Sequence, residues 1–133
     1  ASLHTIDEMA QLSAKLLKDI DFQLSNYATS GLSQNVREAI QYIHTMRFQP
    51  LTTTDVANHL HMNRSYLSHH FHEEVGMCMI EYIHRMKLNF ADQLRISGEY
   101  SFTEIADILG YSSYRYFAQV YKKYRGVLPN QIS

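Results

Sequence analysis

The sequence contains the same short pattern twice, at about residues 51–76 and 101–126, and this duplication limits the folds open to the chain. Each copy begins with a hydroxyl residue followed three positions later by a carboxylate, an arrangement that caps a helix start. One apolar helical face, a short turn and a second apolar run then follow. Two helices joined by so short a turn form a helix-turn-helix motif. A single copy is also compatible with an ordinary helical hairpin, but the second copy favours a repeated helix-turn-helix.

The two copies correspond position by position. The capping pairs are Thr52 with Asp55 and Ser101 with Glu104; Val56, Ala57 and Leu60 match Ile105, Ala106 and Leu109; Leu67 and Phe71 match Phe117 and Tyr121; Gly76 matches Gly126. Asn63 is in a position to cap the second helix of the first copy. The offset is 49 residues at the first helix and 50 at the second, so the match includes one inserted residue.

Two further helices complete the predicted domain. A long helix is predicted between the copies, at about residues 79–97, and Gly98 ends it. Its apolar face contains Ile80, Ile83, Met86, Phe90 and Leu94. Another helix is predicted from Ser33 to near Phe48, with Val36, Ala39, Ile40 and Ile43 on one face. The fold prediction is therefore all-α, with two helix-turn-helix subdomains in residues 33–133 whose separation is set by a long linker helix.

Residues 1–32 are predicted to form an additional N-terminal helix. Between residues 3 and 27, mostly apolar side chains recur at alternating spacings of three and four, as in a heptad seam. Such a seam is compatible with a homodimeric coiled coil and with a helix that packs on its own domain, and both interpretations remain open. Thr29, Ser30 and Gly31 break the pattern and mark a domain boundary.

Composition excludes several classes of protein. Hydrophobic residues make up 45% and charged residues 19%, and no apolar run is long enough to span a membrane. A single cysteine, Cys78, rules out an internal disulfide and agrees with a cytoplasmic location; its neighbours Met77 and Met79 suggest a small core residue. No nucleophile elbow, phosphate-binding glycine loop or H-E-x-x-H motif is present, so neither an enzyme nor a bound cofactor is expected.

Charge is unevenly distributed along the chain. The net charge is −1, but residues 100–133 carry +2, from Arg115, Lys122, Lys123 and Arg125 against Glu104 and Asp107. Nonspecific affinity for DNA increases with the number of phosphates that Lys and Arg side chains neutralise. Because this chain has so little excess positive charge, we expect its nonspecific affinity for DNA to be weak.

The second copy contains the pattern I-A-x-x-x-G-Y-x-S-x-x-Y-F-x-x-x-Y-K-K-x-x-G-x-x-P. Its members are Ile105, Ala106, Gly110, Tyr111, Ser113, Tyr116, Phe117, Tyr121, Lys122, Lys123, Gly126 and Pro129. With this signature, residues 34–133 resemble the DNA-binding domain of AraC/XylS-type transcription regulators. The family usually has Phe where Tyr121 stands and Arg near Lys87. Residues 1–33 lie outside the match and look like the helix that follows a sensor domain.

The resemblance implies seven helices that bind two successive major-groove segments on one face of double-stranded DNA. It also implies transcription regulation, often activation through contacts with RNA polymerase. Most members sense a small-molecule effector, which here would act through a domain that this sequence does not contain. The alternative is a helical protein-interaction or dimerisation module without direct base readout.

Candidate DNA contacts follow from position on the second helix of each copy. Exposed side chains near the start of a recognition helix contact base edges, whereas capping groups and lysines contact phosphates. The predicted base contacts are Arg64, Ser65, Ser68 and His69 in the first copy and Tyr114, Arg115 and Gln119 in the second. The predicted backbone contacts are Thr52, Asn63, His72, Ser101, Ser113, Lys122 and Lys123. Tyr66, Leu67 and Phe71 are assigned to packing, although Tyr66 could do either.

Five histidines crowd the first copy: His59, His61, His69, His70 and His72. No cysteine or well-placed carboxylate completes a ligand set like those of structural zinc, so no metal site is predicted. Protonation of the histidines on approach to phosphate is the preferred hypothesis, and it predicts tighter DNA binding at pH 6 than at pH 8.

Overall fold

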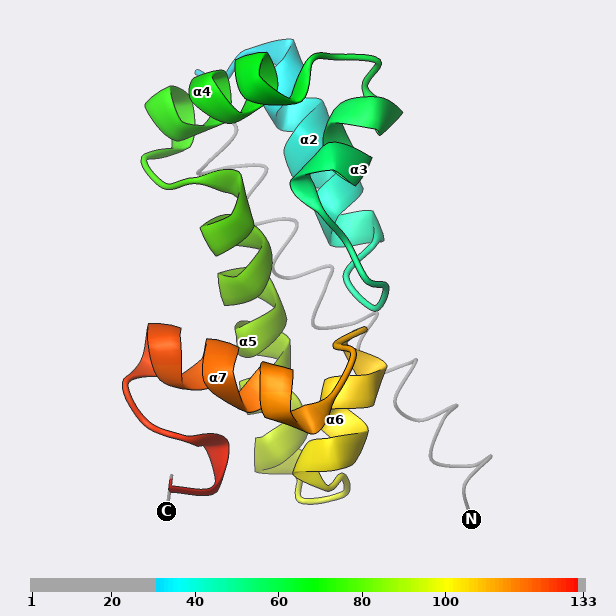
Figure 1. The fold of residues 1–133 in the computed structure, drawn as a ribbon, viewed down its shortest axis with the longest axis vertical. Helices are drawn as coiled ribbons and strands as arrows, with labels where there is room; N and C mark the ends of the chain where they lie inside the picture. Colours follow the sequence, from blue (N-terminus) through cyan, green and yellow to red (C-terminus); the bar gives the residue numbers. More distant parts are fainter. Residues whose placement is uncertain (1–30, 132–133) are drawn as a thin grey trace. The chain divides into compact units, whose positions relative to one another are not determined.

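A computed structural model describes residues 31–131, in which every regular element is helical (Figure 1). The elements are α2 (Gln34–Thr45), α3 (Thr53–His59), α4 (Arg64–Val75), α5 (Met79–Ser97), α6 (Phe102–Ile108), α7 (Tyr114–Arg125) and the 3₁₀ helix η1 (Pro129–Gln131). The all-α prediction with two helix-turn-helix subdomains is confirmed. The described residues form six α-helices and the short 3₁₀ helix η1, beside the seven helices that the resemblance implies. The predicted N-terminal helix and its seam at residues 3–27 lie outside the described residues.

Both helix-turn-helix motifs begin with the predicted capping boxes. The Thr52 hydroxyl accepts from the Asp55 amide at 3.1 Å, and the Asp55 carboxylate accepts from the Thr52 amide at 2.9 Å. Ser101 and Glu104 repeat this exchange at 3.1 and 3.0 Å. These bonds satisfy amides that a helix start leaves without a partner. The local sequence alone therefore determines the residue at which α3 and α6 each begin.

The second helix of each motif, α4 or α7, is also capped, here by one side chain that accepts a single bond. The Asn63 side chain accepts from the Tyr66 amide at 3.0 Å, which starts α4 at Arg64. The Ser113 hydroxyl accepts from the Tyr116 amide at 3.1 Å, which starts α7 at Tyr114. Each cap fixes which residues occupy the first turn of the helix, and therefore which side chains stand at its exposed start.

The core follows the apolar pattern of the sequence. In the first subdomain α2 packs with α3 and α4, and in the second α6 and α7 pack with each other and with α5. Its fully buried members include Val36, Ile43, Val56, Leu67 and Phe71 in the first subdomain, Ile105, Leu109 and Phe117 in the second, and Met79, Ile83 and Leu88 of α5. The linker helix therefore contributes to both subdomains.

Three expectations about packing are wrong. Cys78 is exposed, because it occupies the cap before α5 and Met79, 1% exposed, takes the core position instead. Ile80 is 39% exposed, since the first turn of α5 presents it to solvent. Tyr66, assigned to packing, is 55% exposed and lies against the His70 ring at 4.3 Å. The helix predicted to reach Phe48 ends earlier, at Thr45, and a turn follows.

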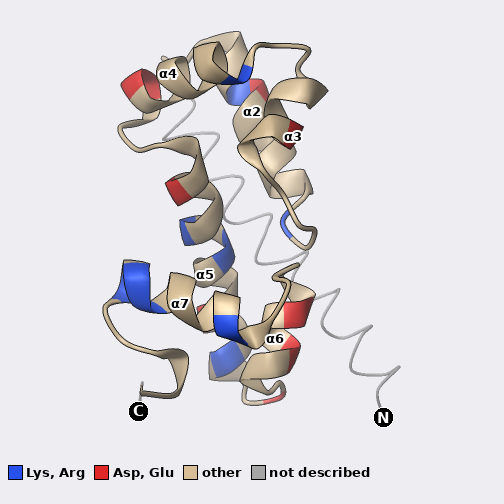
Figure 2. Ribbon diagram, in the orientation of Figure 1, with Lys and Arg blue, Asp and Glu red and all other residues tan. Residues whose placement is uncertain are grey.

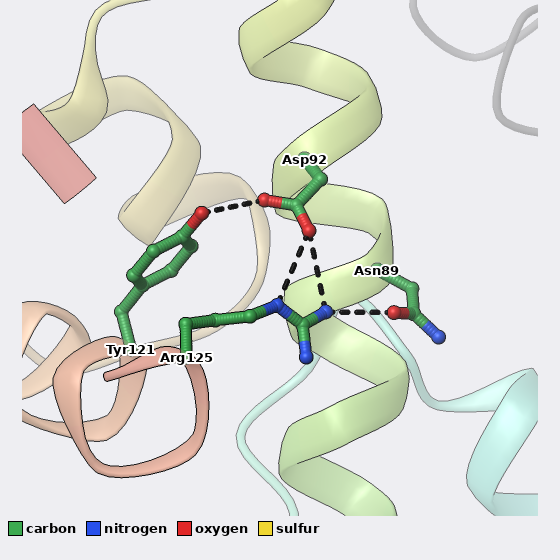
Figure 3. A network of polar contacts seen from close by, with 4 residues as sticks. All are labelled: Asn89, Asp92, Tyr121 and Arg125. Atoms are coloured by element: carbon green, nitrogen blue, oxygen red, sulfur yellow. Dashed lines mark hydrogen bonds and ion pairs between the residues drawn. The ribbon is translucent and has the colours of Figure 1, made fainter. Parts of the chain in front are cut away.

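A polar network fastens α7 to α5 (Figure 3). The Tyr121 hydroxyl donates to one Asp92 carboxylate oxygen at 2.7 Å, and the Arg125 guanidinium donates to the other at 3.2 and 3.3 Å. Arg125 also donates to the Asn89 side chain at 2.8 Å. Burial, and after it the bond to Asp92, raises the pKa of Tyr121 to about 12, so its hydroxyl stays protonated and donates. The hydroxyl that Tyr121 has and a phenylalanine would lack therefore has a partner.

We expect Tyr121→Phe to lower the free energy of unfolding by about 1–2 kcal/mol, because a hydrogen bond to a charged acceptor is lost. Urea unfolding followed by circular dichroism measures the change. In an Asp92→Asn background, Tyr121→Phe should cost less than half as much, because the acceptor is no longer charged. Equal costs in the two backgrounds would show that the hydroxyl acts independently of the carboxylate.

Candidate nucleic-acid interface

The start of α4 presents the predicted readers of the first copy. Arg64, Ser65 and His69 are exposed, and Ser68 is half-buried. A carboxylate accompanies them: His69 Nε2 lies 3.1 Å from a Glu73 oxygen, and both side chains are exposed. A pair so exposed contributes little to stability. It does place a negative charge one helical turn from His69, which reduces the positive potential near that predicted contact.

The start of α7 presents a different set of groups. Arg115 and Gln119 are exposed and lie one turn apart on the same side of the helix. Within residues 31–131 neither side chain makes a hydrogen bond or an ion pair, so both keep their full hydrogen-bonding capacity. Tyr114 is half-buried, with its ring centroid 6.3 Å from that of Phe117, and presents only part of its ring.

The predicted backbone contacts all lie at the surface: Thr52, Asn63, His72, Ser101, Ser113, Lys122 and Lys123. Four of them are the helix caps. A capping hydroxyl accepts a bond through its oxygen and still has its own proton to donate, and the Asn63 amide keeps its two N–H donors. Capping and phosphate binding are therefore compatible at these positions.

Basic side chains are concentrated on the second helix of the second copy, α7. Figure 2 shows basic residues at both ends of α7 and acidic residues on α6. Lys122, Lys123 and Arg125 are in the last turn of α7. The Arg125 guanidinium is engaged by Asp92, and Lys123 Nζ lies 5.4 Å from the Tyr124 ring centroid. Arg115, Lys122 and Lys123 thus supply the positive charge of α7 that is accessible to solvent.

The histidines of the first copy contact different neighbours, and the rings of His69 and His70 also contact each other, with centroids 5.7 Å apart. His59 stacks on Tyr42 with ring centroids 3.8 Å apart, His70 contacts Tyr66, and His69 faces Glu73. In the described part of the chain, no three His, Cys, Asp or Glu side chains converge on a point where a metal ion could sit.

Two aromatic residues near the readers were not among the predicted contacts. Tyr66 and Tyr116 are 55% and 43% exposed, and they occupy the same position in the two copies, one residue before the buried Leu67 and Phe117. Their shared position is a signal that the sequence contained. The sequence pattern assigns Tyr66 to packing with a DNA contact left open, and it gives Tyr116 no role beyond its place in the signature, because each adjoins a true core residue.

A groove lies between the two subdomains, next to both recognition helices. It is lined by Pro50, Leu51, Thr52 and Thr53 before and in α3, Arg64 and Ser68 of α4, Ile80, Ile83, His84 and Lys87 of α5, and Gly110, Tyr111, Ser112 and Tyr116 of the second motif. Three polar side chains of this lining, His84, Lys87 and Tyr111, are more than nine-tenths buried.

Lys87 joins the two subdomains at the floor of this groove. Its ammonium donates to the Gln49 carbonyl at 2.6 Å and to the Leu109 carbonyl at 2.7 Å. It also lies 5.4 Å from the Tyr111 ring centroid. Burial lowers the pKa of Lys87 to about 8, so the side chain is still mainly charged at neutral pH. The sequence indicated nothing of these bonds, because the two carbonyls belong to residues far from Lys87 in the chain.

His84 is the buried base beside this lysine. Its Nδ1 lies 2.9 Å from the Tyr111 hydroxyl, and its ring is stacked with those of Tyr111 and Tyr124. Burial, and after it the positive charges of Lys87 and Lys123, lowers the pKa of His84 to about 4. The side chain is therefore neutral in the folded protein at physiological pH.

Acid should destabilise the fold through His84. Between the unfolded pKa of 6.5 and the folded pKa of about 4, the unfolded state binds a proton that the folded state does not. Stability contributed by the neutral form is present above pH 6.5 and is lost as the pH falls to 4, by up to about 3 kcal/mol. Urea midpoints between pH 7 and pH 4 measure this loss. A His84→Gln variant should show a smaller loss over that range, whereas exposed His72→Gln should match the unmodified protein.

Comparisons with known proteins agree with this geometry. A family model described as "Helix-turn-helix domain" matches residues 56–133. The chain is 38% identical over 81 residues to "Uncharacterized HTH-type transcriptional regulator YfiF" of Bacillus subtilis (strain 168), covering 61% of this chain and 26% of that protein. It spans less than half the length of the curated relatives that it matches.

Solved structures have the same fold. The C-terminal domain of AraT, a response regulator from Geobacillus stearothermophilus, aligns with a TM-score of 0.72 and 37% identity, covering 76% of this chain and 84% of that one. A Chromobacterium violaceum transcriptional regulator, described as an AraC-type DNA-binding domain-containing protein, aligns with a TM-score of 0.64 and 26% identity, covering 73% and 87%.

Proposed function

The chain belongs to the AraC/XylS family of transcription regulators and carries its DNA-binding domain, and on this premise we propose that α4 and α7 are the two recognition helices of a bipartite reader. Each helix enters one of two successive major-groove segments, about 34 Å apart along the duplex. The supporting observation is the start of α7, where Arg115 and Gln119 are exposed and have no partner within residues 31–131.

The chemistry of these side chains suggests how bases are distinguished. Arginine bonds bidentately to guanine O6 and N7, and glutamine to adenine N6 and N7. The exposed part of the Tyr114 ring suits a thymine methyl group. In the first copy Arg64 suits a guanine or a phosphate, while Ser65, Ser68 and His69 form shorter or weaker contacts. The second copy therefore carries more of the sequence preference.

The remaining roles are proposed from the family. The regulator activates transcription through RNA polymerase in the cytoplasm and responds to a small-molecule effector through a further domain. Homodimerisation through residues 3–27 is proposed from their heptad seam, with packing of that helix on its own domain as the alternative. Among the described residues, no helix combines the length and the apolar character needed to cross a lipid bilayer.

Selection of bound sequences from a random DNA pool tests the proposed mode of reading. We expect two short preferred blocks with centres about one helical turn apart, the block read by α7 being the stricter. Failure to enrich any sequence, together with dimerisation that is lost on deleting residues 1–30, would favour the protein-interaction module instead.

Acid should strengthen DNA binding through the first copy. Imidazole as a side-chain type gains positive charge as the pH falls from 8 to 6. The proposed DNA contacts of the first copy include exposed His69, at a base edge, and exposed His72, at the backbone. We expect the dissociation constant to fall severalfold at fixed salt. That decrease corresponds to the affinity gained from about one additional phosphate contact. Titrations of the His69→Gln/His72→Gln variant should show a flatter pH profile, and an identical profile would refute the hypothesis.

A further inference from the structure

The two subdomains are joined by the shared helix α5 and also by contacts to the backbone of the segments before α3 and after α6. Lys87, in the middle of α5, donates to Gln49, which precedes α3, and to Leu109, which ends α6. One ammonium group thus holds a carbonyl from each helix-turn-helix. The side chain is 3% exposed, so these bonds form in a region of low dielectric where charge-assisted bonds are strong.

Gly110 brings the same two segments into direct contact. A Cβ at this position would lie 2.5 Å from the Gln49 carbonyl carbon and 2.6 Å from the Pro50 nitrogen. The matching residue in the first copy is His61, which has a left-handed φ of 56° and an exposed side chain. A left-handed turn residue therefore does not have to be glycine in this fold. Gly110 is needed because the segment before α3 lies against it.

We propose that Lys87 and Gly110 are positioning residues that fix the mutual orientation of the two subdomains, and that they thereby restrict which spacing between the two DNA segments the protein accepts. This inference rests on the proposed bipartite function. The covalent link through α5 fixes how far apart the subdomains are, but a second attachment is needed to fix their mutual orientation. Inserting one base pair moves the second segment by about 3.4 Å and rotates it by about 35°. A rigid junction cannot follow that change, whereas a loosened junction can.

Binding to a series of duplexes tests this role. The duplexes contain the two selected blocks and differ only by one base pair added or removed between them. For the unmodified chain, we expect affinity to fall about tenfold at the wrong spacing, comparable to a mismatched base pair. Lys87→Met should reduce this ratio to about threefold or less. Lys87→Arg keeps a charged donor for the two carbonyls and should retain the ratio of the unmodified chain. A core change in the first subdomain, Ile43→Val, destabilises without touching the junction and should leave the ratio at its original value.

A second measurement separates the junction from DNA binding. Spin labels on Glu73→Cys of α4 and Lys122→Cys of α7, in a Cys78→Ser background, report the distribution of distances between the recognition helices without DNA. We expect a narrow distribution that Lys87→Met at least doubles in width and Lys87→Arg leaves narrow. An unchanged width in Lys87→Met, or an unchanged spacing ratio, would overturn the proposal. A chain that binds no DNA but shows the broadening would refute the bipartite function and leave the junction supported.

Discussion

Replacing Gly110 by Ala is expected to lower the free energy of unfolding by about 3 kcal/mol or more. The residue has φ +79°, where a side chain costs about 1–2 kcal/mol of backbone strain. The new methyl group also meets backbone atoms of Gln49 and Pro50 closer than 3 Å, and these atoms cannot move away without shifting the segment before α3. Urea unfolding of the purified variant, with stability taken from the midpoint and slope, measures the loss.

Gly126→Ala is the matched control. Gly126 has almost the same backbone conformation, with φ +83°, but an added Cβ there would have no neighbour within 4 Å. Its replacement should cost only the backbone strain, about 1–2 kcal/mol. The difference between the two variants therefore isolates the steric contribution of the junction. Equal losses would mean that the Gln49–Pro50 segment yields easily and that the contact fixes nothing.

The local architecture could be predicted because its causes are local. A hydroxyl and a carboxylate three residues apart are enough to place a helix start, and both capping boxes form as the sequence indicates. Apolar periodicity likewise identifies Leu67 and Phe117 as buried anchors of the recognition helices. These interactions join residues within one or two helical turns, so a reading of short windows finds them.

The features that a sequence pattern missed depend on distant partners. The Lys87 ammonium meets carbonyls 38 and 22 residues away, and Tyr121 meets Asp92 at a separation of 29. Backbone carbonyls have no sequence signature, so nothing in the chain marks Lys87 as a junction residue. Cys78 was misplaced for a related reason: a run of small and apolar residues does not show which of them a helix start will turn inward.

Arg115→Ala is expected to remove most of the sequence preference at one base position. A bidentate arginine–guanine contact discriminates against the wrong base by about 1–3 kcal/mol, so the ratio of affinities for matched and scrambled sites should fall by about 5- to 150-fold. Stability should change little, because Arg115 is exposed and makes no hydrogen bond or ion pair within residues 31–131. Arg125 differs in this respect, since its guanidinium holds Asp92 and Asn89.

Lys123→Ala should behave in the opposite way, because an ammonium at the end of α7 suits phosphates rather than base edges. Affinity for matched and scrambled DNA should fall by a similar factor, and the salt dependence of log K should become shallower by about one. Titrations of both variants at two salt concentrations separate the two roles. If Arg115→Ala kept the affinity ratio of the unmodified protein while losing salt dependence, Arg115 would bind phosphate, and base readout by α7 would have to depend on Gln119 and Tyr114.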